Sequence, residues 1–140
     1  MSAGIKPVRV VCDTNVLVSA LLGSPTNQKI YETFKAGHII LLFSKETLAE
    51  LAEVLGRPKF KIPSPALRSL FRIVRQRARI IRKVKSVELC RDPKDNMILA
   101  SALSGKADFL VTGDKDILAV SLISDCKILT PSKFLELLQR

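Results

Sequence analysis

Histidine and tryptophan are nearly absent from this 140-residue chain, which has one histidine, His38, and no tryptophan. A single imidazole excludes histidine-based metal sites and Ser-His-Asp catalysis. Aromatic residues make up only 5% of the sequence, whereas hydrophobic residues make up 47%. We therefore expect a core of leucine, isoleucine and valine, large enough for one domain over residues 1–140.

Cysteine is scarce as well, and the three thiols, Cys12, Cys90 and Cys126, are widely spaced. An odd number at such spacing favours reduced thiols in a cytoplasm over a disulfide framework or a zinc site. The chain has no apolar run of the roughly 18 residues that span a bilayer, and residues 1–7 lack the apolar stretch of a signal peptide. The sequence thus predicts a cytoplasmic protein that does not contact the membrane.

Acidic residues are outnumbered 13 to 23 by lysine and arginine, which gives a formal net charge of +10. No acidic residue lies between Glu53 and Glu88. The basic residues of that segment are Arg57, Lys59, Lys61, Arg68, Arg72, Arg75, Arg77, Arg79, Arg82, Lys83 and Lys85. Such a segment can bind a polyanion through its phosphates, or it can simply form a solvated helix face. Composition leaves both possibilities open.

Short apolar strands alternate with helical patterns along the chain. We predict strands at 8–13, 38–43, 80–84 and 108–112, and an edge strand at 127–129. The predicted helices cover 15–22, 26–36, 45–55, a stretch from 64 onwards, 93–104, a short helix into which 113–116 turn, and 131–138. This alternation predicts an α/β fold, a three-layer α/β/α sandwich around a central parallel sheet of four to five strands.

Local signals set several helix ends. Gly37 occupies the position after a helix that favours glycine, and Ser44 can cap the helix that follows it. Ser64 and Pro65 read as the N-cap and first residue of the basic helix. In that helix Arg68, Arg72, Arg75 and Arg79 should share one face, away from the apolar positions.

The first strand ends at Asp13, directly after the apolar run Val10-Val11-Cys12. Open α/β sheets bind their ligands at the carboxyl ends of the strands. Asp13 can therefore cap the following helix or bind a cation. We favour the second role, because so apolar a strand offers little solvent beside the carboxylate.

Other acids are placed where they could meet Asp13. Asp114 and Asp116 follow the fourth strand, Asp92 and Asp95 open the helix before it, and Glu50 is central in the helical row that also contains Glu46 and Glu53. Taken singly, Asp92, Asp95 and Asp114 can be explained as helix-end residues, and Glu46, Glu50, Glu53 and Asp116 as solvated or helix-start acids. Converging carboxylates would repel one another unless a cation lay between them. Oxygen ligands select Mg²⁺ or Mn²⁺, and such ions beside a basic surface suit phosphodiester cleavage.

Four motifs occur in an order that resembles the PIN-domain family: Asp-Thr-Asn-Val at 13–16, Leu-Ala-Glu-Leu-Ala-Glu-Val-Leu-Gly-Arg-Pro-Lys-Phe at 48–60, Asp-Pro-Lys-Asp-Asn at 92–96 and Val-Thr-Gly-Asp-Lys-Asp at 111–116. The closest subgroup comprises toxin components of toxin–antitoxin pairs, related to VapC-type ribonucleases. The resemblance implies a PIN-like fold and metal-dependent RNA cleavage. It also implies a homodimer, and an antitoxin whose tail enters the acidic groove.

By the same resemblance, Asp13, Glu50, Asp95 and Asp114 match the family's acidic quartet, and Asp116 is an accessory metal ligand. Asn15 and Thr112 match polar positions that brace the site.

The resulting hypothesis is an endoribonuclease that uses Mg²⁺ or Mn²⁺. Its RNA-binding residues would be Arg57, Lys59, Lys61, Arg68, Arg72, Arg75 and Arg79. A non-catalytic RNA- or antitoxin-binding module is the alternative, and the intact quartet argues against it. A haloacid-dehalogenase-type phosphatase is disfavoured, because Asn15 stands where that chemistry needs a second aspartate.

Overall fold

The computed structural model describes residues 7–139, so both ends of the predicted 1–140 domain, residues 1–6 and residue 140, lie outside the described residues. The strands are β1 Val8–Cys12, β2 Ile39–Ser44, β3 Arg79–Ile81, β4 Phe109–Val111, β5 Leu122–Ile123 and β6 Cys126–Leu129. The helices are α1 Thr14–Leu21, α2 Pro25–Lys35, α3 Lys45–Leu55, α4 Ser64–Arg77, α5 Pro93–Ser104, α6 Lys115–Val120 and α7 Pro131–Leu138, with a 3₁₀ turn at Pro58–Phe60.

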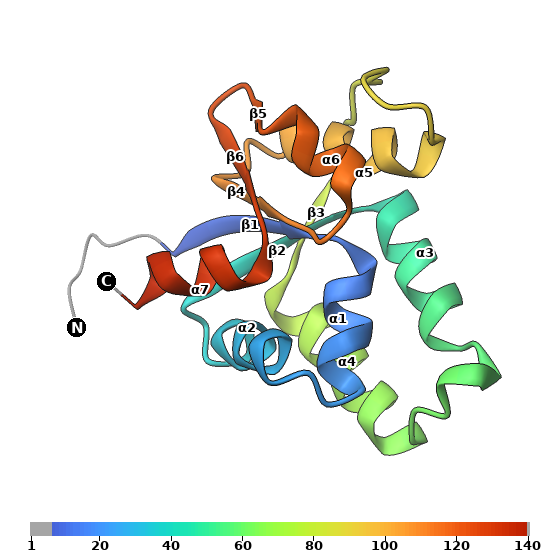
Figure 1. Cartoon of the computed structure of the whole chain (residues 1–140). Helices are drawn as coiled ribbons and strands as arrows, with labels where there is room; N and C mark the ends of the chain where they lie inside the picture. The colour runs from blue at the N-terminus through green and yellow to red at the C-terminus, as the bar shows by residue number, and fades with distance from the viewer. Residues whose placement is uncertain (1–6, 140) are drawn as a thin grey trace.

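The strands form one sheet in the order β3-β2-β1-β4-β6-β5 (Figure 1). All neighbours run parallel except β5 and β6, which are antiparallel. β1 is central, pairing with β2 through Val10↔Leu41 and with β4 through Val10↔Phe109. The carboxyl ends of β1 and β4 therefore meet at the same edge of the sheet.

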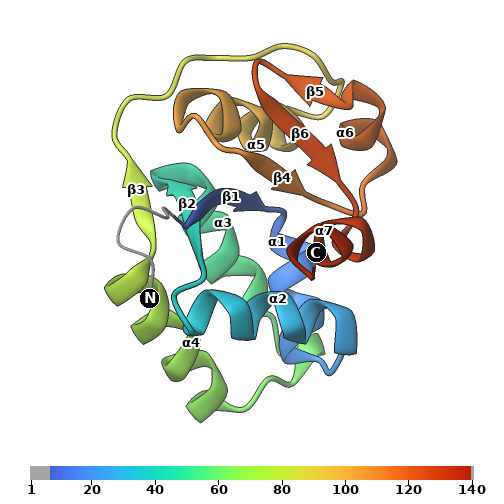
Figure 2. The ribbon, with the colours of Figure 1, turned by 90° about the vertical axis from the view of Figure 1, so that its left-hand side faces the viewer.

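Helices cover both faces of the sheet, which confirms the predicted α/β/α layers. Figures 1 and 2 show α5 on one face and α1, α2 and α4 on the other. Successive residues of β1 supply the two cores: Val10 and Cys12 pack with α1 to α4 and α7, whereas Val11 packs with α5 and α6. Burial on both faces explains why β1 reads as a continuous apolar run rather than an alternating one.

The sheet has six strands instead of the predicted four to five. The additional strand, β5, consists only of Leu122 and Ile123, too few residues for any periodic signal. Because β5 pairs with the outer side of β6, β6 is not the edge strand that we predicted at 127–129. β3 is also shorter than the predicted 80–84, since only Leu42 to Ser44 of β2 pair with it.

Helix ends agree with the sequence in some places and differ in others. Ser44 and Thr47 form the cap of α3, where Ser44 Oγ accepts from Thr47 N at 3.1 Å. Gly37 follows α2 with a positive φ of 82°, as predicted for that position. The N-cap of α4, however, is Pro63 rather than Ser64, because the Pro63 carbonyl accepts the first helical bond, from Ala66 N at 3.0 Å.

None of the helices in residues 7–139 is both long enough and apolar enough to cross a membrane.

Candidate metal centre

Asp13 lies at the carboxyl end of β1, where neighbouring chain segments hold it in place. Its backbone N–H donates to the Val111 carbonyl of β4 at 2.9 Å. Its side chain is 8% exposed and accepts from the Thr112 hydroxyl at 2.8 Å and from the Asn15 backbone N–H at 3.3 Å. Asp13 is therefore both the N-cap of α1 and a buried carboxylate at the ligand-binding edge of the sheet.

The two residues expected to brace this site do so differently. Thr112 is fully buried and acts through its hydroxyl, which also accepts from Asp114 N at 3.0 Å. This one hydroxyl therefore connects the ends of β1 and β4. Asn15 contributes its backbone N–H, whereas the residue itself is exposed.

A tight carboxylate cluster lies beside Asp13. Asp95, Asp114 and Asp116 each offer one carboxylate oxygen, and these oxygens all lie within 4.8 Å of one another. Asp95 is buried in the first turn of α5. Asp114 caps α6 by accepting from Asp116 N at 2.8 Å and from Ile117 N at 3.2 Å. The cap orients Asp114 and brings Asp116 into the first turn of the same helix.

Burial and the crowding of these carboxylates together raise the pKa of Asp95. Burial is the largest cause that raises its pKa, and Asp114, Asp92, Asp13 and Asp116 add to it, so that the pKa reaches about 6. A carboxylate in such surroundings holds its negative charge poorly unless a cation is present.

Glu50 reaches the same region from α3. Its side chain is 17% exposed, and Oε1 lies 4.0 Å from the Lys94 ammonium. The Thr14 hydroxyl donates to Oε2 at 3.5 Å, the upper limit for such a bond. Burial raises the pKa of Glu50, Lys94 opposes this effect, and the negative charge of Asp13 adds to it. Glu50 is thus electrostatically coupled to Asp13, on the α3 side of the cluster.

Sequence reasoning missed two contributors. Lys94 pairs with Glu50, and Asn96 fixes the segment before α5 by accepting from Leu89 N at 3.0 Å and Cys90 N at 2.8 Å. Both residues lie within the quoted Asp-Pro-Lys-Asp-Asn motif. Their contacts depend on tertiary structure, so the motif alone gave no sign of them.

Asp92 and Glu53 lie outside the tight cluster, although the charge of Asp92 contributes to the raised pKa of both Asp95 and Glu50. Asp92 caps α5 by accepting from Lys94 N at 2.9 Å, as its alternative explanation predicted. Glu53 forms an ion pair with Arg57 at 2.8 Å on the exposed surface of α3.

The predicted RNA-binding residues occupy more than one surface. Arg68, Arg72 and Arg75 are exposed on α4, whose opposite face buries Leu70 and Val74. Arg79 does not share their helical face as predicted, because α4 ends at Arg77 and Arg79 begins β3, opposite Leu42. Arg57, Lys59 and Lys61 surround the 3₁₀ turn after α3, where the Lys59 ammonium lies 5.1 Å from the centroid of the Phe60 ring.

Comparison with known proteins agrees with this geometry. The family model described as a PIN domain matches residues 9–116. The chain belongs to the PIN-domain family. The match begins in β1, ends in α6 and contains Asp13, Glu50, Asp95, Asp114 and Asp116. The chain is also similar to the uncharacterized protein MJ1680 of Methanocaldococcus jannaschii, with 31% identity over 152 residues that cover 92% of this chain and 90% of the relative.

Family membership fits the observed chemistry. PIN domains have a nuclease fold and typically use divalent metal ions, and this PIN domain has a cluster of acidic side chains at the carboxyl edge of its sheet. Carboxylate oxygens are the ligands that Mg²⁺ and Mn²⁺ prefer. The residues present are therefore suited to a divalent cation.

Proposed function

We propose that this PIN-domain protein is a metal-dependent endoribonuclease that hydrolyses phosphodiester bonds in RNA. The convergence of Asp95, Asp114 and Asp116 beside the buried Asp13 is the observation that supports it. A purely structural site would gain nothing from such crowding, because every added charge raises the cost of the others.

The proposed ligands of Mg²⁺ or Mn²⁺ are Asp13, Glu50, Asp95 and Asp114, with Asp116 as an accessory ligand. An ion held there would activate water and offset the negative charge that develops on the cleaved phosphate. Thr112 keeps Asp13 oriented through its 2.8 Å hydrogen bond. Lys94, whose side chain is 61% exposed beside Glu50, could bind a phosphate oxygen of the substrate.

We assign RNA-backbone contacts to Arg57, Lys59, Lys61, Arg68, Arg72, Arg75 and Arg79. Most of these side chains are exposed, and several lie on the outer face of α4. Their charge is suited to phosphates, whereas the acidic centre alone would repel RNA.

The motif resemblance supports a more specific role: a cytoplasmic toxin of a toxin–antitoxin pair, acting as a homodimer and silenced by a protein antitoxin. An apolar cavity of about 720 Å³ between α3, α4 and β3 is consistent with a docked protein partner. Lys45, Arg75 and Arg82 line that cavity and favour an acidic amphipathic segment, which would cover Arg75 and so compete with RNA for it.

The decisive experiment is cleavage of a labelled single-stranded RNA in Mn²⁺, Mg²⁺ or EDTA. Asp13→Asn should lower the cleavage rate at least about a hundredfold, because it weakens the proposed metal site. The fold should persist, since asparagine also caps helices. Asp125→Asn, an exposed acid between β5 and β6, is the matched control and should cut normally.

Cleavage by Asp13→Asn at the wild-type rate would refute the assignment of this ligand. Failure of the wild type both to cut and to gain thermal stability from Mn²⁺ would favour the non-catalytic binding module instead. The same two proteins test the toxin role, because induced expression of the wild type, and not of Asp13→Asn, should arrest growth.

A further inference from the structure

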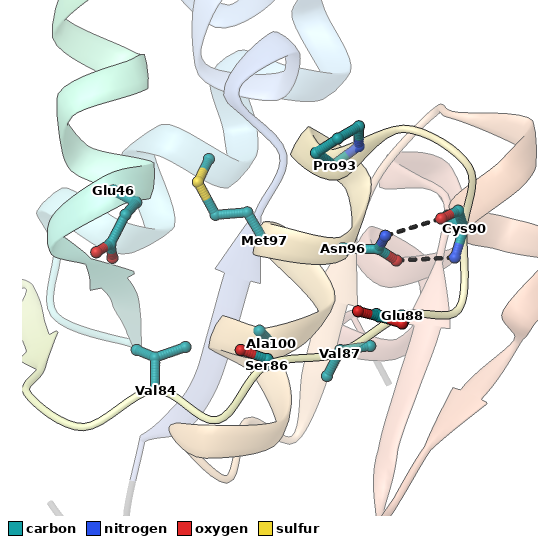
Figure 3. Close-up of a pocket in the computed structure, with 10 residues that line it drawn as sticks. All are labelled: Glu46, Val84, Ser86, Val87, Glu88, Cys90, Pro93, Asn96, Met97 and Ala100. Atoms are coloured by element: carbon teal, nitrogen blue, oxygen red, sulfur yellow. Dashed lines mark hydrogen bonds between the residues drawn. The ribbon is translucent and has the colours of Figure 1, made fainter.

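A cavity of about 580 Å³ opens beside α5, and Figure 3 draws the residues that line it. It lies between the start of α3, one face of α5 and the segment 84–90 that leads into α5. Its size is in the range of small-molecule sites.

The cavity and the candidate metal centre are formed by neighbouring residues of the same segments, although no proposed metal ligand lines the cavity. Met97 lines it and lies two residues after Asp95 on α5, and Glu46 lines it one helical turn before Glu50 on α3. Cys90 also lines it, and its thiol donates to the Asp116 backbone carbonyl at 3.7 Å. The Cys90 contact thus connects the cavity wall to the start of α6, the helix that carries Asp116.

The wall opposite α3 is anchored to α5. The Asn96 side chain accepts from Cys90 N and donates to the Cys90 carbonyl, both at 2.8 Å, as Figure 3 shows. Further along the same wall, Lys85 N donates to the Ser104 hydroxyl at 2.8 Å. These bonds hold the cavity open before any ligand arrives, which reduces the entropy cost of binding.

The chemistry of the lining points to a base rather than a phosphate. Val87, Met97 and Ala100 supply an apolar surface, and the charged lining residues are Glu46 and Glu88. Among the described residues that line it there is no lysine or arginine, although the protein has a net charge of +10. Glu46 and Glu88 are exposed, and within residues 7–139 neither carboxylate has an intramolecular hydrogen bond or ion pair, so both can accept from a ligand.

We propose that this cavity binds one nucleobase of the RNA substrate and selects guanine. This inference rests on the proposed function. Guanine presents two adjacent donors, N1–H and the N2 amino group, which match the two oxygens of one carboxylate. Adenine and cytosine place a ring acceptor beside their amino group, and uracil places carbonyls on both sides of its N–H, so each would leave a carboxylate oxygen facing a lone pair.

Nucleosides test the cavity independently of cleavage, because they carry no phosphate and need no metal ion. We would measure binding of guanosine, inosine, adenosine, cytidine and uridine to the wild type in EDTA by NMR titration. Guanosine should bind about tenfold tighter than the other nucleosides, since a good bidentate contact discriminates by about that factor or more. Inosine, which lacks the N2 amino group, should lose most of this preference.

Glu46→Gln combined with Glu88→Gln should abolish the preference for guanosine, because an amide offers one acceptor oxygen. Glu53→Gln is the control for the α3 position: it removes one negative charge from the helix that carries Glu46, and Glu53 pairs with Arg57 and does not line the cavity. In RNA, the wild type should cut next to guanine, and the double variant should cut with reduced selectivity.

Equal binding of all the nucleosides, no detectable binding, or an unchanged guanosine preference in the double variant would overturn the proposal. Tighter, Glu46- and Glu88-dependent binding of N-acetyl-arginine amide would overturn it in favour of a protein partner. Guanosine selectivity in a protein that cuts no RNA would support the cavity while refuting the nuclease, so the two failures are distinguishable.

Discussion

Asp95 has a pKa well above the ordinary value of an aspartate. Burial and neighbouring carboxylates raise its pKa to about 6, from 3.8 in the unfolded chain. The folded protein thus binds this proton more tightly than the unfolded chain does. Between about pH 4 and pH 6, the free energy of unfolding should fall as the pH rises, and it should stay lower above pH 6.

Asp95→Asn should therefore stabilise the metal-free protein at pH 7.5, by on the order of 1 kcal/mol or a few degrees in Tm. At about pH 3 and below the gain should disappear, because Asp95 is then mostly protonated in both the folded and the unfolded state. Thermal denaturation in EDTA at several pH values measures this. A gain that is independent of pH, or a loss of stability at pH 7.5, would contradict the electrostatic explanation.

The same substitution should also abolish stabilisation by Mn²⁺, which the wild type should show at pH 7.5. If Asp95→Asn stabilises the metal-free protein and also removes the stabilisation by Mn²⁺, then Asp95 lowers the free energy of unfolding but is needed to bind the metal ion.

At the scale of elements, the start of α5 combines a structural carboxylate with a site carboxylate. Asp92 accepts from Lys94 N at 2.9 Å, whereas Asp95, one turn of chain later, points its oxygen toward Asp114 and Asp116. Asp92→Ala should lower the free energy of unfolding by about 1 kcal/mol through loss of the cap, and Asp92→Asn should lower it much less.

Both Asp92 variants should keep RNA cleavage within about threefold of the wild type at saturating Mn²⁺, because Asp92 is not among the proposed metal ligands. Chemical denaturation and the cleavage assay together measure this. Equal stability of the two variants would argue against a capping role, and loss of cleavage in Asp92→Asn would place Asp92 among the functional acids.

The elements that the sequence predicted are those whose signals are local. The caps at Ser44 and Asp92, the glycine after α2 and the buried run of β1 depend on neighbouring residues only. β5 could not be predicted, because its two residues become a strand only by pairing with β6. Arg79 was assigned to a helix because its spacing continues that of α4, whereas pairing with β2 makes it a strand residue.

The same distinction applies to the site. That the ends of β1 and β4 would meet followed from parallel topology, and the structure brings those ends together. Position alone favours a solvated or helix-start role for Asp116, and only the family resemblance predicts it as an accessory ligand. Its carboxylate lies in the tight cluster, because the α6 cap made by Asp114 positions it. The cavity wall at 84–90 has no periodicity and is fixed by Asn96, a contact that only the folded chain contains.

For the whole molecule, charge is separated into an acidic sheet edge and exposed basic side chains on α4 and beyond. If these arginines contact RNA phosphates, affinity should fall linearly with the logarithm of salt concentration. In the Asp13→Asn background, Arg68→Ala with Arg72→Ala should weaken RNA binding and reduce that slope by about 1.4, at roughly 0.7 per phosphate contact on a single strand.

Lys127→Ala with Lys133→Ala is the matched control, since it removes the same charge from exposed positions on β6 and α7. Fluorescence anisotropy at several salt concentrations gives both slopes. Similar slopes for the two double variants would mean that α4 is a solvated surface and that net charge alone attracts RNA.

The 2.8 Å hydrogen bond between Thr112 and Asp13 joins residues 99 positions apart in the chain. Protein synthesis adds about 5–20 residues per second, so β4, the second neighbour of β1, is made roughly 5–20 s after β1. In that interval β1 has an unpaired edge, which is a site for mispairing or chaperone binding. Any activity that needs Asp13 and Asp114 together begins only after this closure, so the nascent chain stays inactive while most of it is being made.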